Sequence, residues 1–158
     1  MKNAGLIADI GLLLLAKNVD FGAAVADYQK KLGGRVTLTT IKTQPHLPTA
    51  ERGKKETAAI LAHVKRRGGT LIALDQGGAL LSSANIATQL EQLQQEHRHI
   101  YFLIGGADGI AKETLTHCRH IWSFGLITYP HGFMPLLLLE QLFRADSILR
   151  GTPYHIGH

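Results

Sequence analysis

The order of segments along the chain predicts an α/β fold, with a mostly parallel sheet and helices on both faces. Short apolar or β-branched runs alternate with longer segments in which apolar residues recur every three to four positions. Parallel neighbours need crossover connections, and the helical segments supply them. Because domains usually contain roughly 100 to 200 residues, the 158 residues are expected to form a single domain spanning 1–158.

The first half of the chain supplies two strands and two helices. The apolar run from Ala4 to Ala16 is interrupted by Asp9. It is also shorter than the roughly 20 residues of a membrane-spanning helix, so we expect a buried first strand and no membrane partner. Apolar spacing along 21–32 predicts a helix, the β-branched run 35–42 predicts a second strand, and 51–67 is predicted to be a helix.

The second half of the chain continues the alternation. We expect strands at 70–74, 100–104 and 121–124, and helices at 83–96, 110–118 and 133–149. The helix at 83–96 is expected to begin at a serine cap.

The composition favours a packed, reduced protein with an anionic partner. Apolar residues make up 45% of the chain and charged residues 18%, which suits a packed core. The net charge of +5 leans toward nucleic acid. Cys118 is the one cysteine, which excludes a disulfide or a cysteine-rich metal site within the chain and fits a cytoplasmic location. We expect no metal to be bound, and solvated side chains for five histidines, namely His63, His97, His99, His117 and His120.

Three loops are candidates for ligand binding, because ligands of open parallel sheets gather at the carboxyl ends of the strands. They are 74–78, 104–109 and 124–131. Glycines in the second loop allow the backbone to approach a ligand closely, although a tight turn without a ligand is an alternative. No Asp or Glu occurs between Glu113 and Glu140, which weakens the alternative of a nucleotide-dependent oxidoreductase.

The segment from about Leu71 to His155 closely resembles the large-subunit ribosomal RNA pseudouridine N3-methyltransferases of the H type, in the SPOUT superfamily. The motifs that carry the resemblance occur in the family's order along more than half the chain. They are LDQGG at 74–78, LSS at 81–83, FLIGGADG at 102–109, WSFGLITYPH at 122–131, LLLEQLFRA at 137–145 and PYH at 153–155.

This resemblance implies a C-terminal trefoil knot in about 71–158 that holds S-adenosylmethionine, and a homodimer in which the partner completes the active site. It also implies that the substrate is a pseudouridine of 23S rRNA, methylated at N3 in the assembled ribosome. Carried over by motif, the implied cofactor-binding residues are Leu74, Gly105, Phe124, Gly125, Leu126, Ile127, Thr128 and Tyr129.

On the substrate side, the resemblance implies roles for Arg144, Tyr154 and His155, with His131 shaping the cofactor loop. The alternatives are that Arg144 pairs with a carboxylate and that the terminal Tyr-His is a tail contributing little to the core. The chain departs from the family at Pro135, where an arginine is usual. Proline is tolerated in a first helical turn, but this departure motivates a second hypothesis, a SPOUT-like RNA-binding dimer without catalysis.

Overall fold

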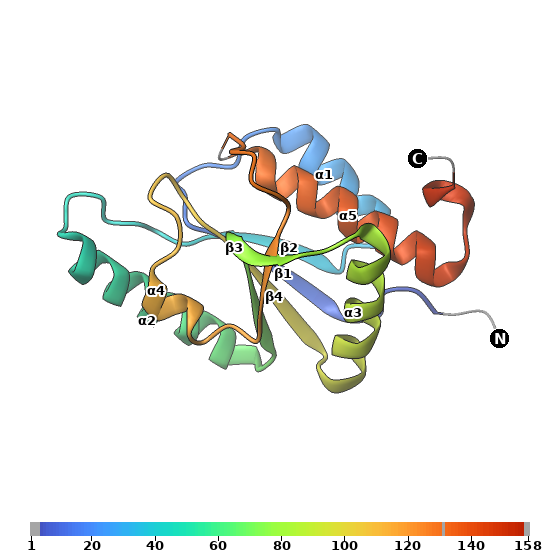
Figure 1. The fold of residues 1–158 in the computed structure, drawn as a ribbon, viewed down its shortest axis with the longest axis horizontal. Helices are drawn as coiled ribbons and strands as arrows, with labels where there is room; N and C mark the ends of the chain where they lie inside the picture. The colour runs from blue at the N-terminus through green and yellow to red at the C-terminus, as the bar shows by residue number, and fades with distance from the viewer. Residues whose placement is uncertain (1–3, 131, 157–158) are drawn as a thin grey trace.

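The computed structural model describes residues 4–130 and 132–156, which form a layered α/β fold (Figure 1). Strands and helices alternate along most of the chain. In order they are β1 (Asp9–Leu14), α1 (Gly22–Lys31), β2 (Val36–Thr40), α2 (Thr49–Arg67), β3 (Thr70–Leu80), α3 (Ser83–Glu96), β4 (His99–Ile104), α4 (Lys112–Leu115), β5 (His120–Ser123), α5 (Phe133–Arg150) and the 3-10 helix η1 (Pro153–His155).

The five strands form one sheet in the order β2-β1-β4-β3-β5, and every neighbouring pair is parallel. β1 lies inside this sheet, where Leu12 pairs with Leu38 on one side and with Phe102 on the other. The apolar run near the N-terminus is therefore a central strand. The predicted fold class, an α/β fold with a parallel sheet and helices on both faces, is confirmed.

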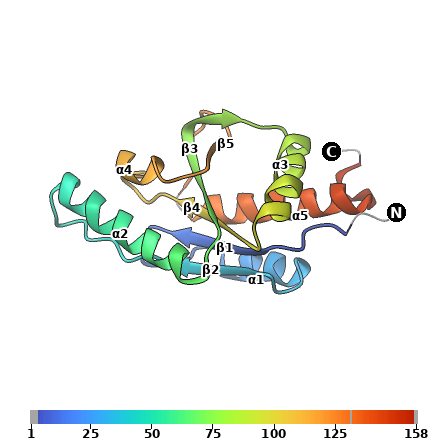
Figure 2. The same ribbon diagram turned by 90° about the horizontal axis from the view of Figure 1, so that it is seen from below.

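Successive residues of each strand point to opposite faces of the sheet, and each face has its own core of buried side chains. Figure 2 shows the helices that lie on the sheet. One core contains Leu12 and Phe102 and is covered by α1, α3 and α5. The other contains Leu13 and Tyr101 and is covered by α2 and α4. On this second face, α2 begins near the carboxyl ends of the strands, beside α4, and ends close to the amino end of β3.

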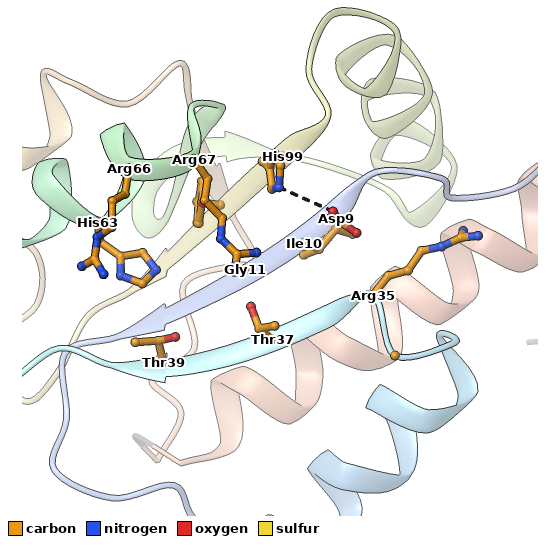
Figure 3. Close-up of a pocket in the computed structure, with 12 residues that line it drawn as sticks. Asp9, Ile10, Gly11, Arg35, Thr37, Thr39, His63, Arg66, Arg67 and His99 are labelled. Atoms are coloured by element: carbon orange, nitrogen blue, oxygen red, sulfur yellow. Dashed lines mark ion pairs between the residues drawn. The ribbon is translucent and has the colours of Figure 1, made fainter.

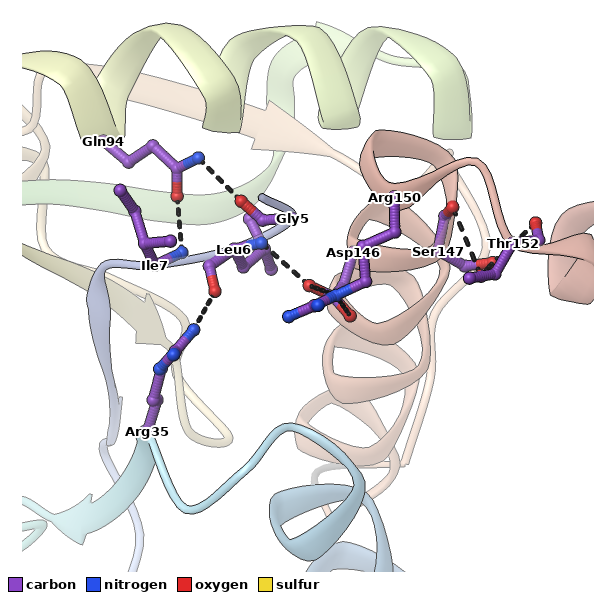
Figure 4. Close-up of polar contacts among 9 residues, drawn as sticks. All are labelled: Gly5, Leu6, Ile7, Arg35, Gln94, Asp146, Ser147, Arg150 and Thr152. Carbon is purple, nitrogen blue, oxygen red and sulfur yellow. Dashed lines mark hydrogen bonds and ion pairs between the residues drawn. The ribbon is translucent and has the colours of Figure 1, made fainter. Parts of the chain in front are cut away.

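The segment before β1 is tied to three other elements by its backbone (Figure 4). The Leu6 amide donates to Asp146 Oδ1 of α5 at 2.8 Å. Gln94 of α3 accepts from the Ile7 amide at 2.9 Å and donates to the Gly5 carbonyl at 3.0 Å. Arg35, just before β2, donates to the Leu6 carbonyl. These bonds satisfy main-chain groups that no strand partner reaches.

Two predicted elements differ from those observed by five or more residues in length. β3 does not end at Leu74, because it resumes pairing with β5 at Ala79 after a register shift, so that Trp122 lies opposite both residues. The helix predicted at 110–118 is only Lys112–Leu115, and the Thr114 carbonyl then accepts a turn bond from the His117 amide at 3.0 Å. Both differences arise from contacts that local spacing does not encode.

The helix at 83–96 begins as expected at a serine cap, which is Ser82. Its side chain accepts from the Asn85 amide at 3.1 Å, and Asn85 Oδ1 accepts from the Ser82 amide at 3.3 Å. Within the described part of the chain, no helix combines the length and the apolar character needed to cross a membrane.

Candidate cofactor-binding site

A cavity of about 370 Å³ lies where the carboxyl ends of β3, β4 and β5 meet. It brings together all three loops that the sequence analysis selected. All but one of the implied cofactor residues line it, namely Leu74, Gly105, Phe124, Gly125, Ile127, Thr128 and Tyr129. Leu126 is the exception, since it does not line the cavity and is 81% exposed.

The first loop, 75–78, bulges out of β3 between the two residues that face Trp122. The Asp75 carboxylate accepts a bond from the Gly77 amide at 2.8 Å, which folds the bulge on itself. Gln76 Nε2 donates to the carbonyls of Leu126 and Ile127 at 3.3 and 3.4 Å. One side chain of the first loop thus fixes the backbone of the third.

The second loop, 105–109, is a tight turn closed by a bond from the Gly109 amide to the Gly106 carbonyl at 3.0 Å. A Cβ on Gly105 would lie 2.9 Å from the carbonyl carbon of Gly109, and one on Gly106 would lie 2.3 Å from the Leu15 carbonyl oxygen. These glycines therefore allow close approach of backbone to backbone, besides exposing main chain to the cavity.

The third loop begins at Ser123, whose hydroxyl accepts from the Gly125 amide at 3.2 Å. Gly125 has φ of +104°, a conformation that side-chain-bearing residues rarely adopt. Farther along, the ring of Tyr129 stacks on Phe133 at a centroid distance of 6.1 Å. The loop is thereby held at both ends, with its middle exposed.

The implied substrate-side residues form a separate cluster on α5 and η1. The Glu140 carboxylate accepts from Arg144 and, at 3.2 Å, from the Tyr154 hydroxyl. The guanidinium of Arg144 also lies over the Tyr154 ring, 5.1 Å from its centroid. The hydrogen bond to Glu140 raises the pKa of Arg144, and burial, followed by a hydrogen bond to Tyr28, raises the pKa of Tyr154 to about 12.

The alternative of a terminal tail with little contact to the core is wrong for Tyr154. Its ring packs on Phe143 of α5, and the chain folds into η1 instead of extending from the helix. The alternative that Arg144 pairs with a carboxylate is confirmed. The side chain of His155 and the whole of His131 lie outside the described residues, so the expectations for them stay predictions.

Within one chain, the two groups of implied residues do not meet. Met134 of α5 lines the cavity, whereas Arg144 stands ten residues farther along the same helix. At 1.5 Å per residue, the two positions are separated by about 15 Å along the helix axis.

Sequence reasoning missed two side chains that organise these groups, Gln76 and Glu140. Gln76 lies in the LDQGG motif, from which only Leu74 was carried over. Glu140 precedes Arg144 by four residues, the spacing at which helical side chains meet, and that signal was available. Pro135 is buried in the first turn of α5, as its tolerance there predicts.

Comparison with known proteins identifies the class first. Residues 11–155 match the family model described as a predicted SPOUT methyltransferase, a span that includes the whole cavity. Solved structures share the fold at low sequence identity. A probable methyltransferase from Bordetella pertussis Tohama I has a TM-score of 0.57 at 10% identity, covering 89% of this chain and 98% of that one. A probable methylase family protein from Haemophilus influenzae Rd KW20 has a TM-score of 0.54 at 11% identity, covering 94% and 70%.

Curated relatives identify the particular family within this class. The ribosomal RNA large subunit methyltransferase H of Polynucleobacter asymbioticus is 38% identical, over 84% of this chain and 86% of the relative. The protein of the same name from Legionella pneumophila strain Paris is 34% identical, over 84% and 88%. The chain belongs to the ribosomal RNA large subunit methyltransferase H family of SPOUT methyltransferases. Because this is a family of methyltransferases, the alternative of a nucleotide-dependent oxidoreductase is wrong.

Proposed function

We propose that this protein transfers the methyl group of S-adenosylmethionine to N3 of a pseudouridine in 23S rRNA, acting on the assembled ribosome in the cytoplasm. The relatives' name supports ribosomal RNA of the large subunit as the substrate. The observation that carries the proposal is the cavity itself, because residues from three loops far apart in the sequence converge there as the resemblance implies.

The lining of the cavity fits S-adenosylmethionine. Its volume of about 370 Å³ falls in the usual range for small-molecule sites. Leu74, Ile104 and Phe124 supply apolar surface for an adenine ring, and backbone groups of the loops are available to its polar edge. Asp75 is the one carboxylate among the described lining residues, and it suits the positive charge of the ligand.

The proposed reaction depends mainly on the alignment of the target base with the methyl group. When bound, S-adenosylmethionine supplies a methyl group already activated by the sulfonium. The protein must hold N3 in line with that group and help the imide proton to leave, so positioning carries much of the rate. We assign the positioning to Arg144, Tyr154 and His155.

We also propose that the chain forms one SPOUT domain over 1–158, with a trefoil knot in about 71–158. Two contacts support this arrangement. β5 pairs with β3 and not with β4, the strand before it in sequence. The side chain of Gln76 then binds the main chain at Leu126 and Ile127, so that the third loop is held against the first.

A homodimer would bring the two groups of residues together. Beside the cofactor cavity lies a second hollow of about 300 Å³, lined in part by Phe124, Tyr129 and Leu137. Leu80, at its edge, is 71% exposed, and the neighbouring Leu126 is 81% exposed. We propose that a second copy covers this apolar surface and presents its Arg144 and Tyr154 to the cavity. The partner's residues would then reach the cofactor site that the same residues of one chain do not reach.

Methyl transfer to ribosomes that lack the modification, followed by mapping of the product, tests this function. We expect one methylated pseudouridine in 23S rRNA. S-adenosylmethionine at 100 times its dissociation constant should stabilise the native protein by about 2.7 kcal/mol, and NADH should have no effect. Binding of S-adenosylmethionine and of ribosomes without methyl transfer would instead support the non-catalytic RNA-binding dimer that Pro135 suggests. In that case, a Pro135→Arg variant that transferred the methyl group would show that Pro135 causes the loss of catalysis.

A further inference from the structure

A second cleft lies on the α2 face of the sheet, near the amino ends of the strands (Figure 3). Its volume is about 340 Å³. Its floor is the part of β1 and β2 that α2 leaves uncovered, including Gly11, Thr37 and Thr39. None of its residues lines the cofactor cavity. We call this hollow the α2 cleft.

The walls of the α2 cleft are basic. Arg66 and Arg67, from the last turn of α2, line it. Arg35, just before β2, lies at its edge, but its side chain extends away from these two arginines (Figure 3) and donates to the Leu6 carbonyl. Asp9 is the one carboxylate among the described lining residues, and it lies 3.5 Å from His99 Nε2. Within the described chain, neither Arg66 nor Arg67 has a carboxylate partner.

The electrostatics of the cleft show the effect of these arginines on a neighbouring group. The pKa of His63 is lowered, first by burial and then by the charges of Arg66 and Arg67. Figure 3 shows the His63 and Arg66 side chains close together and the Arg67 side chain extending from α2 toward β1. An anion in the cleft would offset the charges of Arg66 and Arg67 and would favour the protonated form of His63.

At Gly11 the floor of the α2 cleft is closed by an aromatic ring. The ring of Tyr101 lies across Gly11, where a Cβ would stand 2.7 Å from the ring. His63 meets the same ring edge-on at a centroid distance of 5.8 Å. Glycine therefore leaves room for the Tyr101 ring, and the side chains of Thr37 and Thr39 beside it supply hydroxyl groups that can form hydrogen bonds.

We propose that the α2 cleft binds the phosphodiester backbone of RNA, at a site separate from methyl transfer. Two guanidiniums without carboxylate partners, with hydroxyl groups nearby, can bind phosphate oxygens. The inference rests on the proposed ribosomal RNA substrate. Such contacts position a nucleic acid without reading its sequence, so they would orient the ribosome while the cofactor cavity selects the base.

The test compares two double variants that remove the same charge from the two ends of α2. Arg66→Gln with Arg67→Gln removes the cleft arginines. Lys54→Gln with Lys55→Gln removes two exposed lysines that lie outside the α2 cleft. Binding of protein-free 23S rRNA and of unmodified ribosomes is measured over a range of salt concentrations, alongside S-adenosylmethionine binding and thermal melting.

We expect the arginine pair to weaken RNA binding roughly tenfold at low salt and to reduce the slope of log affinity against log salt by about two. The lysine pair should change both quantities much less. S-adenosylmethionine binding should be unchanged in both variants. Equal weakening by the two pairs would overturn the proposal, because net charge alone would then explain the loss. Unchanged RNA binding by the arginine pair would overturn it as well.

Two further arms separate other outcomes. In nuclear magnetic resonance titrations, His63 should protonate at higher pH with the RNA bound than without it. Inorganic phosphate or AMP that displaced the RNA at micromolar concentration would make the cleft a small-molecule site and overturn the RNA assignment. A wild-type protein that transfers no methyl group, but whose RNA binding is weakened by the arginine pair as expected, would count against the proposed function and leave the cleft assignment intact.

Discussion

The ring of Tyr154 packs edge-on against the ring of Phe143, with centroids 4.7 Å apart and an interplanar angle of 70°. This contact fastens η1 to α5. It gives Tyr154 a structural role besides any role at the substrate, and mutations at this position must separate the two.

Replacing Tyr154 by alanine should destabilise the protein by about 1 to 2 kcal/mol, because the ring contact and the hydrogen bond to Glu140 are both lost. Tyr154→Phe keeps the ring and should cost less than half as much. Denaturant unfolding at a fixed protein concentration measures both changes. An alanine variant as stable as the wild type would show that the C-terminal contacts contribute nothing to the fold.

The stability that the Tyr154 hydroxyl provides should depend on pH. Burial raises the pKa of this phenol to about 12, from an ordinary value of 10.0. The folded state therefore disfavours ionisation, so the contribution is complete below pH 10 and is lost as the pH rises toward 12. The difference in unfolding free energy between wild type and Tyr154→Phe should shrink over this interval. A constant difference would mean that the hydroxyl titrates normally.

Gly105→Val should abolish S-adenosylmethionine binding. The new Cβ would stand 2.9 Å from Gly109 carbon, so the turn that lines the cavity must move. Gly22→Val is the matched control, because a Cβ there meets no atom within 4 Å. Calorimetry measures binding, and circular dichroism checks the fold. If folded Gly105→Val binds as tightly as the wild type, the 105–109 loop is not part of the cofactor site.

Gln76→Glu should weaken S-adenosylmethionine binding about three- to tenfold, because the substituted side chain keeps its size but loses the donor that holds two carbonyls of the third loop. Gln95→Glu, at an exposed position of α3, applies the same chemical change as a control. Both affinities are measured by calorimetry. Equal effects at the two positions would show that the added charge matters and the loop contact does not.

Cys118 should react slowly with alkylating agents while the protein is folded. Its thiol donates to the Thr114 carbonyl at 3.5 Å, and burial raises its pKa to about 11 from 9.0. At about pH 8 the thiolate population is then roughly a hundredfold lower than for an ordinary cysteine. Mass spectrometry after iodoacetamide treatment, with and without urea, provides the comparison. Equally fast alkylation in both conditions would contradict the burial.

The fold was predictable from local patterns wherever those patterns were strong. The β-branched run that became β2 and the serine cap of α3 needed no long-range information. The strand order did not follow from spacing, because it depends on which apolar strands pair across the sheet. The extension of β3 to Leu80 likewise arises only because β5 lies beside it.

The candidate site divides in the same way. Position at the carboxyl ends of strands was enough to select the three loops, and motif resemblance named the residues that line the cavity. Neither argument indicated that Gln76 would bind the backbone of a loop about 50 residues later. The distance between the cavity and Arg144 was also hidden, because helix direction is settled by packing against the sheet.

The helix α2 extends from the 105–109 loop, which lines the cofactor cavity, to the α2 cleft. Near its start, Arg52 pairs with Asp108 of the 105–109 loop at 3.4 Å, and its last turn carries Arg66 and Arg67. Arg66 follows Arg52 by fourteen positions on the same helix, so the two residues are about 21 Å apart along the helix axis. With the roles proposed for the cofactor cavity and the α2 cleft, α2 would fix the distance between the methylated base and a bound phosphate. A target base would be chosen by how far it lies from an anchored phosphate, a criterion of geometry that needs no reading of the surrounding sequence.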